Sequence, residues 1–152
     1  MLVVFDLDFT LWDCGGVWVD CTNPPFKRQN GYVIDRLQRI IALYPEVPKL
    51  LNKLKEKNIK LALASRTSEP LWANELLDLF GIGNCFEYKE IYPSSKTVHF
   101  NRLHKKSGTN FSDMYFFDDE YRNIQDVSEL GVNCQYVKNG VNLENVLNFI
   151  QY

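Results

Sequence analysis

Two aspartates and a threonine follow a short apolar run near the start of the chain: Asp6, Asp8 and Thr10 come directly after Val-Val-Phe at residues 3–5. Three polar side chains on one face of a core strand would be costly, so we expect the strand to end near Asp6 and a loop to follow. Two carboxylates this close repel each other unless a cation or a shared proton separates them. The pattern therefore favours a metal-dependent site over a solvated acidic loop.

Polar residues also follow three of the four later apolar runs. The runs at residues 59–64, 86–92, 113–117 and 132–137 are typical of strands, and amphipathic patterns predict helices at about 45–58, 69–81, 93–108, 121–130 and 141–150. This alternation indicates an α/β fold with a five-stranded parallel sheet and helices on both faces. The residues at or near the strand ends are Ser65, Arg66, Lys96, Asp118, Asp119 and Glu120.

Ligands of open parallel sheets bind outside the carboxyl ends of the strands. We therefore expect the acids, Ser65 and Lys96 to meet at one edge of the sheet. Several carboxylates without His or Cys suit a hard divalent cation, Mg²⁺ better than Zn²⁺, while a hydroxyl and an ammonium group suit phosphate oxygens. Together these groups describe phosphoryl transfer through an aspartyl-phosphate, and hence a phosphorylated small molecule or phosphoprotein as substrate.

The same residues, in order and spacing, resemble the four motifs of the haloacid dehalogenase-like (HAD) phosphatases: DLDFT from Asp6 to Thr10, then Ser65, Lys96 and Asp118-Asp119. The segments LYPEVPKLLNKL, ASRTSE, EIYPSSK and FFDDEYRNI resemble a small, capless branch of that family. The resemblance covers nearly the whole chain and implies a three-layer, Rossmann-like fold.

The resemblance also implies a role for each motif residue. Asp6 would be the nucleophile and Asp8 the general acid/base. Mg²⁺ would be held by the Asp6 carboxylate, the Asp8 backbone carbonyl and Asp119, with Asp118 nearer the second coordination sphere. Ser65 and Lys96 would hold the phosphoryl oxygens, and Arg66 resembles an additional substrate contact. The substrates implied are phosphotyrosine-type esters or sugar phosphates, including protein-linked ones.

Residues 12–35 are expected to form a β-rich flap beside the site. Gly15-Gly16 predicts a hairpin turn, and Pro24, Pro25 and Gly31 exclude a crossover helix. Trp18 would pack at the foot of the flap or contact the substrate. The motif spacing leaves no room for a larger cap, so we expect an open site. Residues 13–17 look like an insertion relative to the family pattern.

Composition limits the other functions. The 152 residues, 45% of them apolar and 24% charged, suit one HAD-like domain over 1–152. The net charge of −2 and the absence of a long apolar run predict no nucleic-acid or membrane partner. We expect a cytoplasmic monomer with reduced thiols, although Cys14 and Cys21 flank the predicted hairpin and could meet.

Two other classes of protein were weighed. A signalling receiver domain needs an aspartate after its third strand and a lysine after its fifth, where this chain has Glu90-Ile91-Tyr92 and Lys138. An idle HAD scaffold that only binds phospho-ligands remains the alternative, although the presence of both Asp6 and Asp8 favours an enzyme. His99 and His104 are five residues apart, which suits neither turn of a helical metal site, and they are expected at the surface or in packing.

Overall fold

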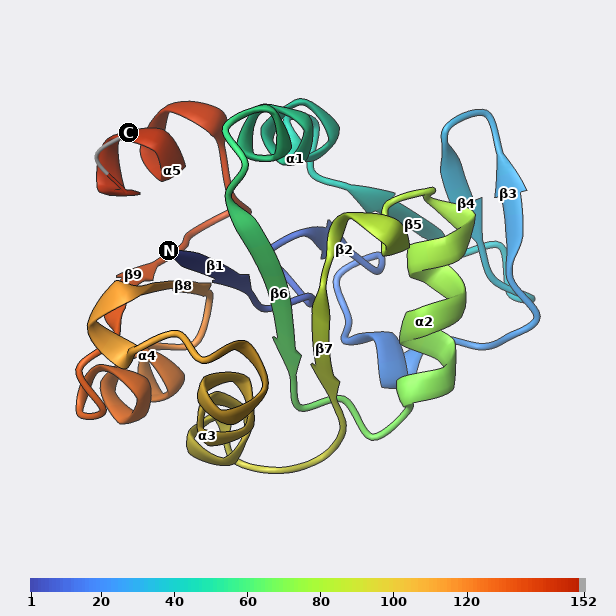
Figure 1. Cartoon of the computed structure of the whole chain (residues 1–152). Coiled ribbons are helices and arrows are strands. Elements are labelled where there is room, and N and C mark those ends of the chain that lie inside the picture. The colour runs from blue at the N-terminus through green and yellow to red at the C-terminus, as the bar shows by residue number, and fades with distance from the viewer. Residues whose placement is uncertain (151–152) are drawn as a thin grey trace.

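A five-stranded parallel sheet lies at the centre of the computed structural model, which describes residues 1–150 (Figure 1). The strand order β7-β6-β1-β8-β9 places the first strand of the chain in the middle. The strands are β1 (Leu2–Phe5), β6 (Lys60–Ser65), β7 (Tyr88–Ile91), β8 (Met114–Asp118) and β9 (Asn133–Tyr136). All five predicted strands are confirmed, and the fold is the predicted α/β class.

Helices cover both faces of the sheet and bury β1 completely. Val3 and Phe5 face one core with α1, α2 and α5, whereas Leu2 and Val4 face the other with α3 and α4. Apolar residues at every position are what a parallel strand covered on both faces requires. The helices are α1 (Val47–Glu56), α2 (Pro70–Leu79), α3 (Lys96–Ser107), α4 (Tyr121–Ser128) and α5 (Leu143–Ile150), with short 3-10 helices at Val19–Cys21, Gly83–Cys85 and Phe111–Asp113.

A second, four-stranded antiparallel sheet forms the flap, in the order β2-β5-β4-β3. It extends beyond the predicted boundary at residue 35, because its strand β5 comes after that position. The buried Asp35 accepts hydrogen bonds from the backbone N–H groups of Leu37 and Arg39, both at 2.9 Å, and so closes the turn into β5. The strands are β2 (Trp12–Asp13), β3 (Lys27–Gln29), β4 (Tyr32–Ile34) and β5 (Ile40–Leu43).

The predicted hairpin at Gly15-Gly16 is wrong. Strand β2 pairs with β5, Trp12 opposite Leu43, so the chain after β2 leaves the sheet instead of folding back on it. The hairpin of the flap lies between β3 and β4, where Asn30 and Gly31 have φ values of 50° and 88°. Asn-Gly is the dipeptide that tolerates positive φ at both central positions of a tight hairpin turn, and this was the signal to read.

Two further expectations concern cysteines and membranes. All four cysteines are free thiols, Cys14 buried and Cys21 exposed, so the pairing considered for them is not formed. Among residues 1–150, none of the helices combines the length and apolar character needed to traverse a bilayer.

Candidate active site

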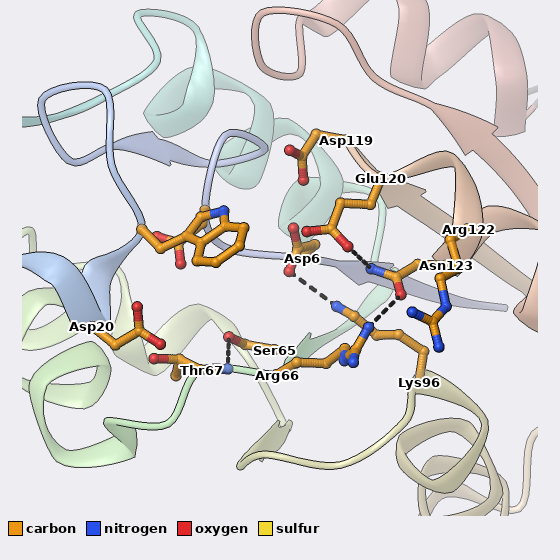
Figure 2. A pocket seen from close by; sticks show the side chains of 12 residues that line it. Asp6, Asp20, Ser65, Arg66, Thr67, Lys96, Asp119, Glu120, Arg122 and Asn123 are labelled. Carbon is orange, nitrogen blue, oxygen red and sulfur yellow. Dashed lines mark hydrogen bonds and ion pairs between the residues drawn. The ribbon is translucent and has the colours of Figure 1, made fainter.

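A pocket of about 330 Å³ lies at the carboxyl ends of the central strands (Figure 2). Asp6 follows β1, Ser65 ends β6 and Lys96 begins α3, so three of the predicted residues meet there as parallel-strand geometry requires. The side chains that line the pocket are Asp6, Asp8, Trp18, Asp20, Ser65, Arg66, Thr67, Lys96, Asp119, Glu120, Arg122 and Asn123.

Lys96 is a buried cation between two carboxylates. Its Nζ lies 2.9 Å from Asp6 Oδ1 and 3.2 Å from Asp118 Oδ2, and it also donates to the Ala64 carbonyl. Burial alone would lower the pKa of Lys96, but the carboxylates of Asp6 and Asp118 raise it, so the side chain stays protonated. Ser95 caps α3 by accepting a hydrogen bond from a backbone N–H of its first turn, which places Lys96 at the first helical position.

Asp6, Asp118 and Asp119 form a group in which one oxygen of each carboxylate lies within 4.8 Å of the others. Burial, followed by the charge of Asp6, raises the pKa values of Asp118 and Asp119. One ammonium group cannot neutralise three carboxylates, so the site favours a further cation. Oxygen donors at this spacing fit a hard divalent ion such as Mg²⁺.

Asp118 differs from Asp119 in its hydrogen bonds. Its Oδ1 accepts from the Glu120 backbone N–H at 2.8 Å, and its Oδ2 accepts from Asn123 Nδ2 at 3.1 Å as well as from Lys96. Both oxygens of Asp118 are thus already occupied by donors. Asp118 is completely buried, whereas Asp119 is partly exposed and lines the pocket.

Asp8 points away from this group and toward the flap. Its Oδ1 accepts hydrogen bonds from Trp12 Nε1 at 2.9 Å and from the Val19 backbone N–H at 3.0 Å. The chain can turn here because Phe9 adopts a positive φ of 59°, which confirms the predicted loop after the strand. Burial raises the pKa of Asp8 to about 7, opposed by the hydrogen bond from Trp12 and assisted by the charge of Asp6.

The remaining predicted residues surround Asp6. Thr10 Oγ1 donates to Asp6 Oδ2 at 3.3 Å, and the Ser65 hydroxyl accepts from the Thr67 backbone N–H at 3.3 Å. Arg66 lies at the exposed side of the pocket, where its Nη1 donates to Asn123 Oδ1 at 3.2 Å. All the predicted site residues thus lie in or against one pocket.

Comparison with known proteins assigns the chain to a family. A family model described as acid phosphatase matches residues 1–151. The chain belongs to this acid phosphatase family.

Its relatives place the family within the HAD superfamily. The human magnesium-dependent phosphatase 1 is 52% identical over 94% of this chain and 81% of its own length. A HAD-like hydrolase superfamily protein of Schizosaccharomyces pombe is 36% identical over 98% of the chain and 91% of its own. A phosphatase-domain fragment from Bacteroides fragilis, solved in complex with Mg, superposes with a TM-score of 0.69 at 19% identity, over 99% of this chain and 39% of the longer one.

Two features of this acid phosphatase were missed in the sequence. Asn123 is buried, and its side chain links Asp118 and Glu120, as acceptors, to Arg66, as donor. The signal was a polar residue in the first turn of α4, on the side that faces the sheet.

The second feature is the wall contributed by the flap side. Trp18, whose place was left open, is 53% exposed and lines the pocket. Asp20 lines it too, and its Oδ2 accepts a hydrogen bond from Ser68 Oγ at 2.9 Å, which links this wall to the segment before α2. No local pattern announced these contacts, since they depend on where a long loop comes to rest.

The two histidines of this acid phosphatase are packing residues, as expected. His99 is completely buried, with Nε2 3.0 Å from the Tyr92 carbonyl and its ring edge-on to that of Tyr92. His104 bonds the Thr109 carbonyl through Nδ1 at 2.7 Å. His99 thereby holds the loop that leads from β7 to Lys96.

Proposed function

We propose that this chain is a magnesium-dependent phosphomonoesterase that works through an acyl phosphate on Asp6. The observation that carries the proposal is the pairing of two carboxylates, two residues apart, in different surroundings. Asp6 contacts Lys96 and belongs to the acidic group, whereas Asp8 is held apart by donors from Trp12 and Val19. Two acids with separate environments can divide nucleophilic attack and proton transfer between them.

In the first half-reaction, a carboxylate oxygen of Asp6 attacks phosphorus and the bond from phosphorus to the leaving oxygen breaks. Asp8, as the carboxylic acid, gives its proton to that leaving oxygen. In the second half-reaction, Asp8 as the carboxylate takes a proton from water, whose oxygen attacks the phosphorus of phospho-Asp6. The Asp6 carboxylate is regenerated and inorganic phosphate leaves.

The other polar residues bind and orient the phosphoryl group. Lys96 and the Ser65 hydroxyl would donate to its oxygens, and Arg66 would contact the substrate from the exposed side. The residues that would hold Mg²⁺ are Asp6, Asp119 and the Asp8 carbonyl, with Asp118 behind them. The ion would supply positive charge, which would offset the negative charge of the phosphoryl oxygens and of the carboxylates.

The substrate class follows from the open pocket. Aryl phosphates of the phosphotyrosine type and sugar phosphates, free or attached to protein, could reach Asp6 without the opening of a cap. The human relative's name includes dependence on magnesium, which supports the same requirement here.

An Asp8→Asn variant tests the division of labour. A good leaving group needs little protonation, so p-nitrophenyl phosphate should still phosphorylate Asp6, while hydrolysis of the resulting acyl phosphate lacks its base. Phosphoenzyme should therefore accumulate, as a mass increase on intact-mass spectrometry after rapid acid quench. Alkyl phosphates should lose more activity than aryl phosphates.

The matched control is Asp126→Asn, an exposed acid of α4 outside the pocket, which should turn over normally and trap nothing. Equal fractional loss on aryl and alkyl esters, without trapped phosphoenzyme, would remove Asp8 from the role and point to Asp118 or Glu120. A wild-type protein that binds phosphate but never hydrolyses p-nitrophenyl phosphate in Mg²⁺ would favour a binding module.

A further inference from the structure

Two arginines on one side of the pocket have no acidic partner among residues 1–150. Figure 2 shows Arg66 and Arg122 on the opposite side from Asp20. Arg66 has a single hydrogen bond, to the amide oxygen of Asn123. Arg122 makes no hydrogen bond or ion pair with any residue in the range 1–150. Both side chains are solvent-exposed, so most of their N–H donors are free to bind a ligand.

The acids nearby are already engaged elsewhere. Glu120 lines the pocket, and its Oε2 accepts from Asn123 Nδ2 at 3.3 Å (Figure 2). Asp20, on the far side, is bonded to Ser68. Within residues 1–150, the two guanidinium groups on this wall therefore make no ion pair, whereas Lys96 on the floor is paired with Asp6 and Asp118.

The pocket has more room than the reacting group needs. A phosphoryl group amounts to about four water-sized oxygens of roughly 30 Å³ each, less than half of the pocket's volume of about 330 Å³. The remainder must accommodate the leaving group. A guanidinium fork matches the geometry of a carboxylate or phosphate better than that of a neutral polar group.

We propose that Arg122, together with Arg66, forms a subsite for a second anionic group carried by the leaving group of the substrate. The inference rests on the proposed phosphomonoesterase function and narrows its substrate class to phosphate esters that also bear a carboxylate or a second phosphate. The subsite sets specificity, and the chemistry remains on the floor of the pocket.

The test compares esters that differ in one charge. In Mg²⁺, 3- and 4-carboxyphenyl phosphate are each compared with the carboxamide of the same geometry, and 1,4-phenylene bisphosphate extends the series to a second phosphate. For an exposed ion pair we expect kcat/KM to favour at least one anionic ester by about fivefold. The preference should shrink as salt is raised.

In an Arg122→Gln variant, kcat/KM for the anionic ester should exceed that for the neutral ester by less than about twofold. Arg28→Gln, which removes an exposed arginine of β3 outside the pocket, should keep both the ratio and the activity of the wild type. Thermal unfolding checks that each variant is folded. The larger of the carboxylate and bisphosphate ratios identifies which anion the subsite prefers.

A wild-type ratio near one for every anionic ester, or a preference that survives Arg122→Gln, would overturn the subsite. If the neutral carboxamides are hydrolysed, that failure leaves the proposed function intact. If no ester is hydrolysed in Mg²⁺, the proposed function fails first and the subsite falls with it.

Discussion

The two sheets of this protein contribute to the pocket in opposite ways. The central strands of the parallel sheet are buried, and Asp6, Asp118 and Lys96 at its carboxyl edge are almost completely buried too. The antiparallel flap has short strands, and all three residues of its edge strand β3 are exposed. The long loop of the flap brings Trp18 and Asp20 to the pocket in contact with solvent.

This difference in burial indicates which side of the pocket can hold the ionised groups that take part in catalysis. Buried strand ends hold carboxylates at fixed separations, in surroundings that shift their pKa values. Side chains on the solvent-exposed wall keep their pKa values closer to those in water, but they can still recognise a leaving group. We therefore expect changes at the buried ends of the parallel strands to affect catalysis and stability strongly, and changes at exposed side chains of the pocket wall, on either side, to affect substrate preference mildly.

The largest effect should follow Asp6→Asn, because an amide cannot form the acyl phosphate. Turnover of p-nitrophenyl phosphate should fall by a factor on the order of a thousand or more. Asp126→Asn again serves as the control. Residual activity above about a hundredth of wild type would contradict the nucleophilic role, as would beryllofluoride bound elsewhere than Asp6 in a crystal.

Chelation of the metal should cause the second-largest loss of activity. Excess EDTA should reduce hydrolysis at least about a hundredfold, and Mg²⁺ should restore it. Ca²⁺ should restore it poorly, because its larger coordination shell accepts bidentate carboxylates and would hold Asp6 in a non-attacking geometry. Full activity in EDTA or in Ca²⁺ would refute the metal site described.

Lys96→Met should test how far the floor depends on its buried cation. Removal of the ammonium group leaves the buried carboxylates of Asp6 and Asp118 without their cationic partner, which should cost about 3–5 kcal/mol of unfolding free energy. Mg²⁺ should raise the melting temperature of the variant more than that of the wild type. The control Lys138→Met changes an exposed lysine. A loss below about 1 kcal/mol would show that the pair contributes little.

The buried His99 should make stability fall in mild acid. Burial, assisted by the positive charge of Lys96, lowers its pKa to about 4 from 6.5. Between these values the unfolded chain takes up a proton that the folded chain does not, so unfolding free energy falls as pH drops, by up to about 3 kcal/mol. Denaturant unfolding of His99→Gln across this window should show a shallower decline. Identical slopes would mean that other groups dominate.

Trp18→Ala should give the smallest effect. Because the side chain is 53% exposed, unfolding free energy should change by no more than about 0.5 kcal/mol, whereas kcat/KM for an aryl phosphate should fall about two- to tenfold from lost stacking. Leu37→Ala removes an exposed apolar side chain elsewhere in the flap and should change neither quantity. A large loss of stability would show that Trp18 belongs to the core.

The parallel sheet could be predicted from the sequence more fully than the flap. Asp6, Ser65 and Asp118 could be placed together from sequence, because parallel strands end at a common edge and apolar runs mark their positions. The flap could not be assigned correctly, since strand β5 (Ile40–Leu43) pairs with Trp12 and Asp13, about 30 residues earlier, and no local pattern records that partner. Its hairpin, by contrast, was locally encoded in Asn30-Gly31 and was overlooked.

Within the pocket, the residues that were missed are those whose role depends on a neighbour. Asn123 matters because its amide bonds both Asp118 and Arg66, and Arg122 because no residue between 1 and 150 forms a hydrogen bond or ion pair with it. Such relations arise from the docking of α4 against the sheet edge. Residue type and spacing identify groups that can react, but the hydrogen bonds that orient them become visible only in the fold.

The central position of β1 also determines when the pocket can exist during protein synthesis. Leu2 pairs with Lys60 on one side and with Met114 on the other, so β1 is synthesised well before either of its neighbours. At about 5–20 residues per second, Asp118 follows Asp6 by roughly 6 to 20 seconds of translation. During that interval the chain carries an apolar strand without its second partner, and a ribosome-bound fragment that lacks β8 has Asp6 but cannot assemble the pocket floor.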